Sequence, residues 1–169
     1  MEIKDIGILC LHCKKTSEIP RWVIIDIYNK IMNYSPLSKE ELDMFKKLKN
    51  LKVIFDVGAR TDIDYIRLRP KAEFHLFEPN PEAFELLKSK VRNRKNVFLN
   101  NFGLGDKEEE RGFQTGQQSF IGSDAIPDLT ARVDLMIPIK TLNDYVREHN
   151  IEQIDFLNIK NIVLEDFGG

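Results

Sequence analysis

The hydrophobic positions of this chain follow one period before residue 50 and another after it. Between Arg21 and Tyr34, apolar residues recur at the three- and four-residue spacing of an amphipathic helix. A second helix is expected to begin at Ser38, because Ser38 and Glu41 have the spacing of a capping box. The pattern therefore predicts an N-terminal helical segment over residues 1–50.

After residue 50 the pattern changes to short, continuous apolar runs of the kind found in strands that are buried on both faces. Helical segments separate the runs. Strands are expected at Val53–Phe55, Phe74–Phe77, Asn96–Leu99, Val133–Lys140 and Ile154–Ile159, with helices at about Thr61–Leu68, from the stretch Glu78–Pro81, and at Thr141–Asn150. Strands that alternate with helices are joined by right-handed crossovers, so we expect a parallel sheet in an α/β domain over residues 51–169.

Length, charge and composition narrow the class of protein. The chain has 169 residues, with 25 Lys and Arg against 27 Asp and Glu, so there is no basic field that would favour nucleic acid. No apolar run reaches the roughly 20 residues of a membrane span. The N-terminus lacks the apolar region of a secretory signal, and two cysteines cannot form a disulfide framework. We expect a single-domain cytoplasmic protein that binds neither nucleic acid nor membrane.

Cys10 and Cys13 flank a histidine and look like half of a metal or redox site. Zinc requires four ligands, and the chain has no second pair of cysteines. His75 and His149 lie far away in sequence and have no recognisable ligand spacing. We therefore expect no metal site and two reduced thiols in a helix, with a site shared across a dimer or a redox pair as the alternatives.

Candidate binding residues follow two of the expected strands. In open parallel sheets, ligands bind at the carboxyl ends of the strands, where the strand order reverses. Asp56 and Gly58 end the first strand, and a glycine there allows the backbone to approach a ligand closely. Glu78 follows the second strand, 22 positions after Asp56, and a carboxylate about 20 residues downstream of such a turn can accept hydrogen bonds from both ribose hydroxyls. Together these residues predict a nucleoside-binding site.

The glycine pattern favours one nucleoside ligand over others. A dinucleotide requires G-x-G-x-x-G, but Gly58 is followed by Ala59, Arg60, Thr61 and Asp62, and the chain contains no P-loop motif. S-adenosylmethionine contains a ribose and an adenine but no phosphate, so one glycine and one carboxylate can suffice. S-adenosylmethionine is therefore the expected cofactor, with a nicotinamide dinucleotide as the weaker alternative.

The strings VIFDVGA at Val53–Ala59 and FEPNPEAFELL at Phe77–Leu87 resemble the FkbM-type family of S-adenosylmethionine-dependent methyltransferases. Three later segments match in order and spacing: Asn101–Asp106, Ile139–Asp144 and Ile154–Leu157. The resemblance covers roughly Leu51 to Ile159, and FEPNP is its most specific part. It implies a Rossmann-like class I methyltransferase sheet and methyl transfer to a small acceptor, commonly a hydroxyl of a sugar or secondary metabolite.

Carried over by position, the resemblance places Gly58 and Ala59 against the methionine part of the cofactor and Glu78 on the ribose. Phe102 and Gly103 would flank the adenine, and Arg60 could pair with the methionine carboxylate. The full expected set of cofactor-binding residues is Asp56, Gly58, Ala59, Arg60, Glu78, Pro79, Phe102 and Gly103. No catalytic residue is assigned, and His75 or His149 stays open as a general base.

The chain also departs from the family's motifs. Where the family continues D-V-G-A-N-x-G, this chain has Arg60 and Asp62, although Asp62 can also be read as a first-turn charge of a helix capped by Thr61. Where the family reads D-F-L-K-I-D-x-E-G-x-E, this chain has Asn158 and Lys160, and the acidic residues that follow are out of register. The alternative is therefore a catalytically incomplete, methyltransferase-like binding or assembly module.

The stretch from Lys107 to Arg132 is polar and contains glycine, and no simple helix fits it. Lys107–Arg111 is expected to be a solvated turn. Gly112–Pro127 is either a mobile loop on the acceptor side or an ordinary surface connection, and we favour the former because long connections are often functional.

The length leaves one further expectation. The chain supplies roughly the first four parallel strands of a larger sheet, so Ile154–Ile159 should have an exposed outer edge. A second copy in a homo-oligomer could cover that edge, or the C-terminal tail could do so. The third alternative is a C-terminally truncated enzyme.

Overall fold

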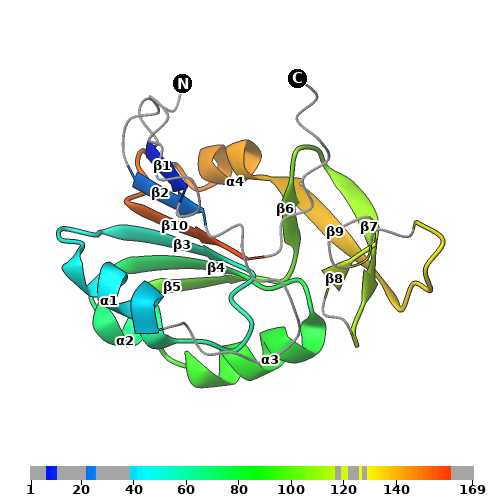
Figure 1. Cartoon of the computed structure of the whole chain (residues 1–169), viewed down its shortest axis with the longest axis horizontal. Helices are drawn as coiled ribbons and strands as arrows, with labels where there is room; N and C mark the ends of the chain where they lie inside the picture. Colours follow the sequence, from blue (N-terminus) through cyan, green and yellow to red (C-terminus); the bar gives the residue numbers. More distant parts are fainter. Residues whose placement is uncertain are drawn as a thin grey trace.

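The computed structural model describes residues 7–10, 22–25, 39–116, 119–121, 126 and 129–160. In these residues the chain is α/β, with parallel and mixed sheets and four helices, an architecture compatible with a Rossmann-like fold (Figure 1). None of the helices that it describes is long and apolar enough to cross a membrane.

The central sheet consists of β3 (Val53–Val57), β4 (Glu73–Phe77), β5 (Val97–Asn100) and β10 (Phe156–Ile159). All its neighbouring strands are parallel, in the order β10-β3-β4-β5, which confirms the expected parallel sheet. The chain proceeds from β3 through β4 to β5 in one direction, whereas β10 lies on the other side of β3. The strand order therefore reverses between β3 and β10, and this is where an open parallel sheet binds its ligands.

Helices cover both faces of this sheet, as Figure 1 shows. One face carries α1 (Lys39–Lys47), α2 (Asp64–Leu68) and α3 (Pro81–Lys90), and the opposite face carries α4 (Leu142–Glu148). Residues of alternate parity in β3 point to the two sides, so both clusters contain β3 residues. The first cluster includes Phe45, Ile54, Ile66, Phe74 and Leu87, and the second includes Phe55, Val57, Phe77, Tyr145 and Val146.

Two expected helix starts need comment. The helix expected from Ser38 is confirmed as α1, but Ser38 lies outside the described residues. The helix expected from Thr61 begins later, at Asp64, and its N-cap is Ile63, which makes no side-chain capping bond. Thr61 as a cap was therefore wrong. Asp62 instead accepts a hydrogen bond from the Asp64 N–H at 2.8 Å, so it supports the first turn of α2 from outside.

A second sheet is built from residues that the sequence pattern largely presented as loop. It contains β6 (Gly103–Gly105), β7 (Glu109–Gln114), β8 (Ser119–Phe120) and β9 (Leu135–Thr141), in the order β6-β9-β7-β8. The β6–β9 pair is parallel and the other pairs are antiparallel. Only β9 was expected, at Val133–Lys140.

The solvated turn and the loop expected after Lys107 are therefore wrong in part. Glu109–Arg111 and Gly112–Gln114 belong to β7, while Phe120 in β8 is 4% exposed and packs on Phe113. The sequence did not indicate β7 because one face of this strand meets solvent and carries charged residues, so the strand contains few apolar residues. Parts of Gly112–Pro127 lie outside the described residues.

The N-terminal segment contains strands where helix was expected. β1 (Gly7–Cys10) and β2 (Trp22–Ile25) form a parallel pair. The helix expected over Arg21–Tyr34 is thus wrong at Trp22–Ile25, where a short apolar run fits either a strand or one helical face. The rest of that range, and Cys13, lie outside the described residues. Cys10 is in a strand, not in the expected helix.

The position of β2 bears on the outer edge of β10, which was expected to be exposed. β2 lies alongside β10, on the side away from β3 (Figure 1). An N-terminal strand therefore lies beside the outer edge of β10, although the two strands are not hydrogen-bonded neighbours in one sheet. A homo-oligomer stays a prediction, but this edge no longer motivates it.

Candidate functional site

A recess lies where the carboxyl ends of the central strands face the second sheet. The cavity volume that a water molecule can reach is only about 20 Å³, so in this structure side chains nearly fill the recess. Six of the eight expected cofactor-binding residues line it: Gly58, Arg60, Glu78, Pro79, Phe102 and Gly103. The other two lie beneath it, since Asp56 is 3% exposed and Ala59, at 1%, belongs to the core under α2.

The turn after β3 is shaped by the protein's own backbone. Gly58 has φ +78°, and the N–H groups of Gly58 and Ala59 both donate to the Phe77 carbonyl, at 2.8 and 3.1 Å. A Cβ on Gly58 would lie 2.2 Å from the carbonyl oxygen of Lys160. Within the chain itself, glycine is therefore required here by the turn and by the close approach of Lys160.

Glu78 is the central acid of the recess and is 4% exposed. One carboxylate oxygen accepts the Arg60 N–H at 2.6 Å, and the other accepts the Asn80 N–H at 2.8 Å. Burial raises the pKa of Glu78 to about 7, although these two N–H groups and the charge of Arg60 act in the opposite direction. Each oxygen keeps a second lone pair, so the carboxyl group can still accept hydrogen bonds from a ligand.

Arg60 adds a cation to the same recess. Its backbone is held at φ +52°, because its N–H donates to Glu78 at the end of the neighbouring strand. Its side-chain Nε is buried and has no hydrogen-bond partner among the residues that the structure describes. A buried donor without a partner costs about 1–3 kcal/mol, and an anionic ligand group could satisfy it.

Asp56 is paired within the sheet. Its carboxylate accepts a hydrogen bond from the Asn158 side chain at 2.8 Å, and the two residues are direct neighbours in β3 and β10. Burial raises the pKa of Asp56, while Lys160 and Asn158 act to lower it. Asp56 is thus a buried support of the recess floor, where the resemblance predicted a ligand contact.

The far side of the recess is apolar and tightly filled. Asn101 donates to the carbonyl oxygens of Glu78 and Pro79, at 2.8 and 3.2 Å, which ties the end of β5 to the end of β4. A Cβ on Gly103 would lie 2.8 Å from the Phe120 ring, so this ring of the second sheet packs directly on Gly103. The recess is therefore narrow at the end where adenine is expected.

Neither histidine of the described chain lines the recess. His75 is 1% exposed, and its two ring nitrogens bond the Tyr145 hydroxyl and Glu73, at 2.8 and 2.9 Å. Burial lowers its pKa. His149 lines a separate groove with Glu73, at the amino ends of the strands. The recess therefore offers neither histidine as a general base.

Sequence reasoning missed the contribution of the second sheet. Phe113 and Phe120 line the recess, although both come from the stretch expected to be turn or loop. Lys160 was noted only as a departure from a motif, yet it also lines the recess. The sequence signal that could have identified these strands was the presence of two aromatic residues, Phe113 and Phe120, in a mostly polar stretch. In the described ranges, no group of three or more His, Cys, Asp or Glu side chains is placed to hold a metal ion.

Taken together, the recess joins one buried carboxyl group, two cations and an apolar wall at the point where the strand order reverses. Such a combination suits a small ligand that has hydroxyl groups and an anionic group. Comparison of the chain with protein-family models, with curated proteins and with solved structures finds no match.

Proposed function

We propose that this chain is an S-adenosylmethionine-dependent methyltransferase domain of FkbM-like type, which methylates a hydroxyl group of a small acceptor. The observation that carries the proposal is the convergence of Gly58, Arg60 and Glu78 in one recess at the reversal of strand order. The resemblance of the sequence to this family supports the same assignment.

The recess residues suggest how the cofactor would be held. Glu78 would accept hydrogen bonds from the ribose hydroxyls through the free lone pairs of its oxygens. Arg60, with its unpartnered buried Nε, would bind the methionine carboxylate. Phe102 and Gly103 would flank the adenine. This end is narrow, so adenine binding requires the Phe120 ring to move away from Gly103.

The protein would act mainly by alignment. When bound, S-adenosylmethionine would supply an electrophilic methyl group to the acceptor oxygen, with its sulfur leaving as a thioether that keeps the electron pair of the broken bond. The hydroxyl proton leaves to water or to a base. Holding the oxygen in line with the methyl group lowers the barrier by removing the entropy of encounter. His75 and His149 are not suited as the base, because neither lines the recess.

Calorimetric titration with S-adenosylhomocysteine tests the cofactor assignment. We expect binding to the unaltered chain, and a loss of at least about tenfold in affinity in Glu78→Gln, because an amide can accept at only one of its two terminal atoms. Glu82→Gln is the matched control, since Glu82 is an exposed acid in the first turn of α3. Circular dichroism would confirm that each variant is folded.

The absence of binding to the folded, unaltered chain at millimolar ligand would refute the cofactor assignment. That result would instead favour a catalytically incomplete methyltransferase-like module. Two observations motivate this second candidate. Phe120 packs where adenine is expected, and the Asp56 carboxylate already accepts a hydrogen bond from the Asn158 side chain.

A further inference from the structure

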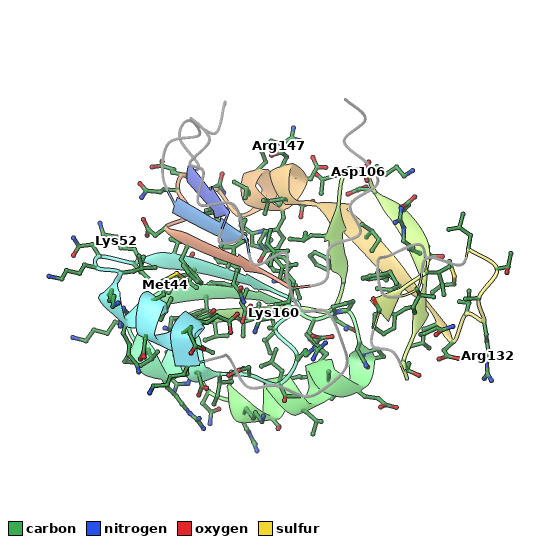
Figure 2. The ribbon with its side chains drawn as sticks, viewed as in Figure 1. Met44, Lys52, Asp106, Arg132, Arg147 and Lys160 are labelled. Carbon is green, nitrogen blue, oxygen red and sulfur yellow. The ribbon has the colours of Figure 1, made fainter. Side chains whose placement is uncertain are left out.

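Lys160 is the charged residue of the recess that the proposed cofactor leaves unused. It directly follows β10, and its N–H donates to the Val57 carbonyl at 2.7 Å, so the pairing of β10 with β3 extends to it. Its carbonyl oxygen lies against Gly58. These backbone contacts hold the root of the side chain at the reversal of strand order, where Figure 2 shows Lys160 between the two sheets.

The ammonium group of Lys160 forms no ion pair with the residues that the structure describes. Within the part of the chain that the structure describes, it has no hydrogen bond or ion pair. Its charge is felt by Asp56, whose pKa it lowers, but Asp56 is buried in the sheet and already accepts a hydrogen bond from Asn158. The lysine charge is therefore available to a ligand.

A second cation lies in the same recess. Arg60 contributes a second cation, with a buried Nε that lacks a partner. Of the acids nearby, Glu78 accepts a backbone N–H at each oxygen, and Asp62 accepts the Asp64 N–H at the start of α2. Arg60 and Lys160 are thus two cationic side chains that line one recess, beside carboxyl groups whose oxygens already accept hydrogen bonds from the chain.

The strand order determines which part of a ligand each cation would meet. With adenine at the end of β5 and ribose at the end of β4, the methionine carboxylate reaches Arg60 after β3. The next strand is β10, so Lys160 lies beyond the cofactor, on the side from which the acceptor would approach. S-adenosylmethionine has a single carboxylate, and Arg60 already accounts for it.

We propose that Lys160 recognises an acidic group, a carboxylate or phosphate, on the methyl acceptor. The acceptor class is then a small anionic hydroxyl compound. This inference rests on the proposed function and names the substrate class of the same recess. Lysine suits this role because its ammonium group is a flexible point charge that can meet either kind of anion.

A pair of matched probes tests the inference on the full chain. The probes are 3-hydroxybenzoate and 3-hydroxybenzamide, which share the ring and hydroxyl but differ in charge; the aromatic wall of the recess suits the ring. Each is titrated by calorimetry with saturating S-adenosylhomocysteine. We expect the acid to bind at least about tenfold more tightly than the amide, because hydrogen bonds to charged groups are the stronger ones.

Three variants locate the effect. Lys160→Met should abolish the preference for the acid, and Lys160→Arg should retain it. Lys52→Met should leave it unchanged, because Lys52 is an exposed lysine at the opposite end of β3 (Figure 2). Affinity for S-adenosylhomocysteine should stay within about twofold in Lys52→Met, because Lys52 does not line the recess.

Equal affinity for the two probes, including no binding of either, would overturn the inference, as would a preference that survives in Lys160→Met. If S-adenosylhomocysteine itself fails to bind, the proposed function fails. The same probes are then titrated without it, and a Lys160-dependent preference for the acid would still establish the anion site.

Discussion

At the scale of single residues, Glu78 couples the recess to pH. Its pKa is about 7 in the folded chain against 4.5 for an ordinary glutamate, with burial as the largest cause. Between these two pH values the folded chain binds more protons than the unfolded chain, so the free energy of unfolding falls as pH rises. The contribution of Glu78 is fully present below pH 4.5 and is lost as pH passes 7.

We therefore expect Glu78→Gln to flatten the dependence of stability on pH between about 5 and 8. The flattening should amount to roughly 3 kcal/mol at most, taking 1.4 kcal/mol for each pKa unit. Urea unfolding at several pH values measures it, with Glu82→Gln as the control. The raised pKa of Asp56 acts in the same direction and is retained in both variants. Parallel curves for the unaltered chain and Glu78→Gln would contradict the prediction.

Gly58 and Gly116 form a matched pair of glycines. At Gly58 a methyl group would lie 2.2 Å from the Lys160 carbonyl oxygen, on a backbone at φ +78°, whereas at Gly116 it would meet none of the described residues within 4 Å. Gly58→Ala should lower the free energy of unfolding by about 2–3 kcal/mol, from the left-handed conformation together with the displacement of the Lys160 backbone. Gly116→Ala should change it by less than about 0.5 kcal/mol. Similar losses in the two variants would show that the contact with Lys160 is not what requires glycine.

At the scale of elements, a distant arginine closes the end of α1. The guanidinium of Arg69 donates to the carbonyl oxygens of Phe45, Lys46 and Leu48, at 3.2, 3.1 and 2.7 Å, and lies over the Phe45 ring. The last carbonyls of a helix lack partners within it, so the side chain provides donors for Lys46 and Leu48, while the Phe45 carbonyl also accepts the Leu48 N–H at 3.2 Å.

Arg69→Met should therefore destabilise the chain by about 1–3 kcal/mol, measured by chemical unfolding. Arg67→Met is the control, because Arg67 is exposed and makes only a surface pair with Asp64 in its own helix. Its loss should cost less than about 1 kcal/mol. If the two variants were equally stable, the cap on α1 would contribute nothing.

The elements also show where pattern reading succeeded. β3, β4 and β10 were predicted because strands buried on both faces are largely apolar, a local property, and β5, although only partly buried at the sheet edge, carries the apolar run Val97–Leu99. β7 was not, because it is partly solvated and its charged residues and glycine obscure the alternation, and β8 was not, because it has only two residues. At Trp22–Ile25 the apolar residues fit two periods, and pairing with β1 decided between them.

At the scale of the whole molecule, the same division applies to the candidate site. The sequence by itself determined the parallel α/β core and the proximity of Gly58, Arg60 and Glu78, because the carboxyl ends of neighbouring parallel strands meet at one edge of a sheet. Only the tertiary structure decided that β2 lines β10, that Phe113 and Phe120 close the recess, and that the Lys160 backbone lies on Gly58. These contacts join segments far apart in the chain, and local periodicity carries no information about which distant surfaces will pack together.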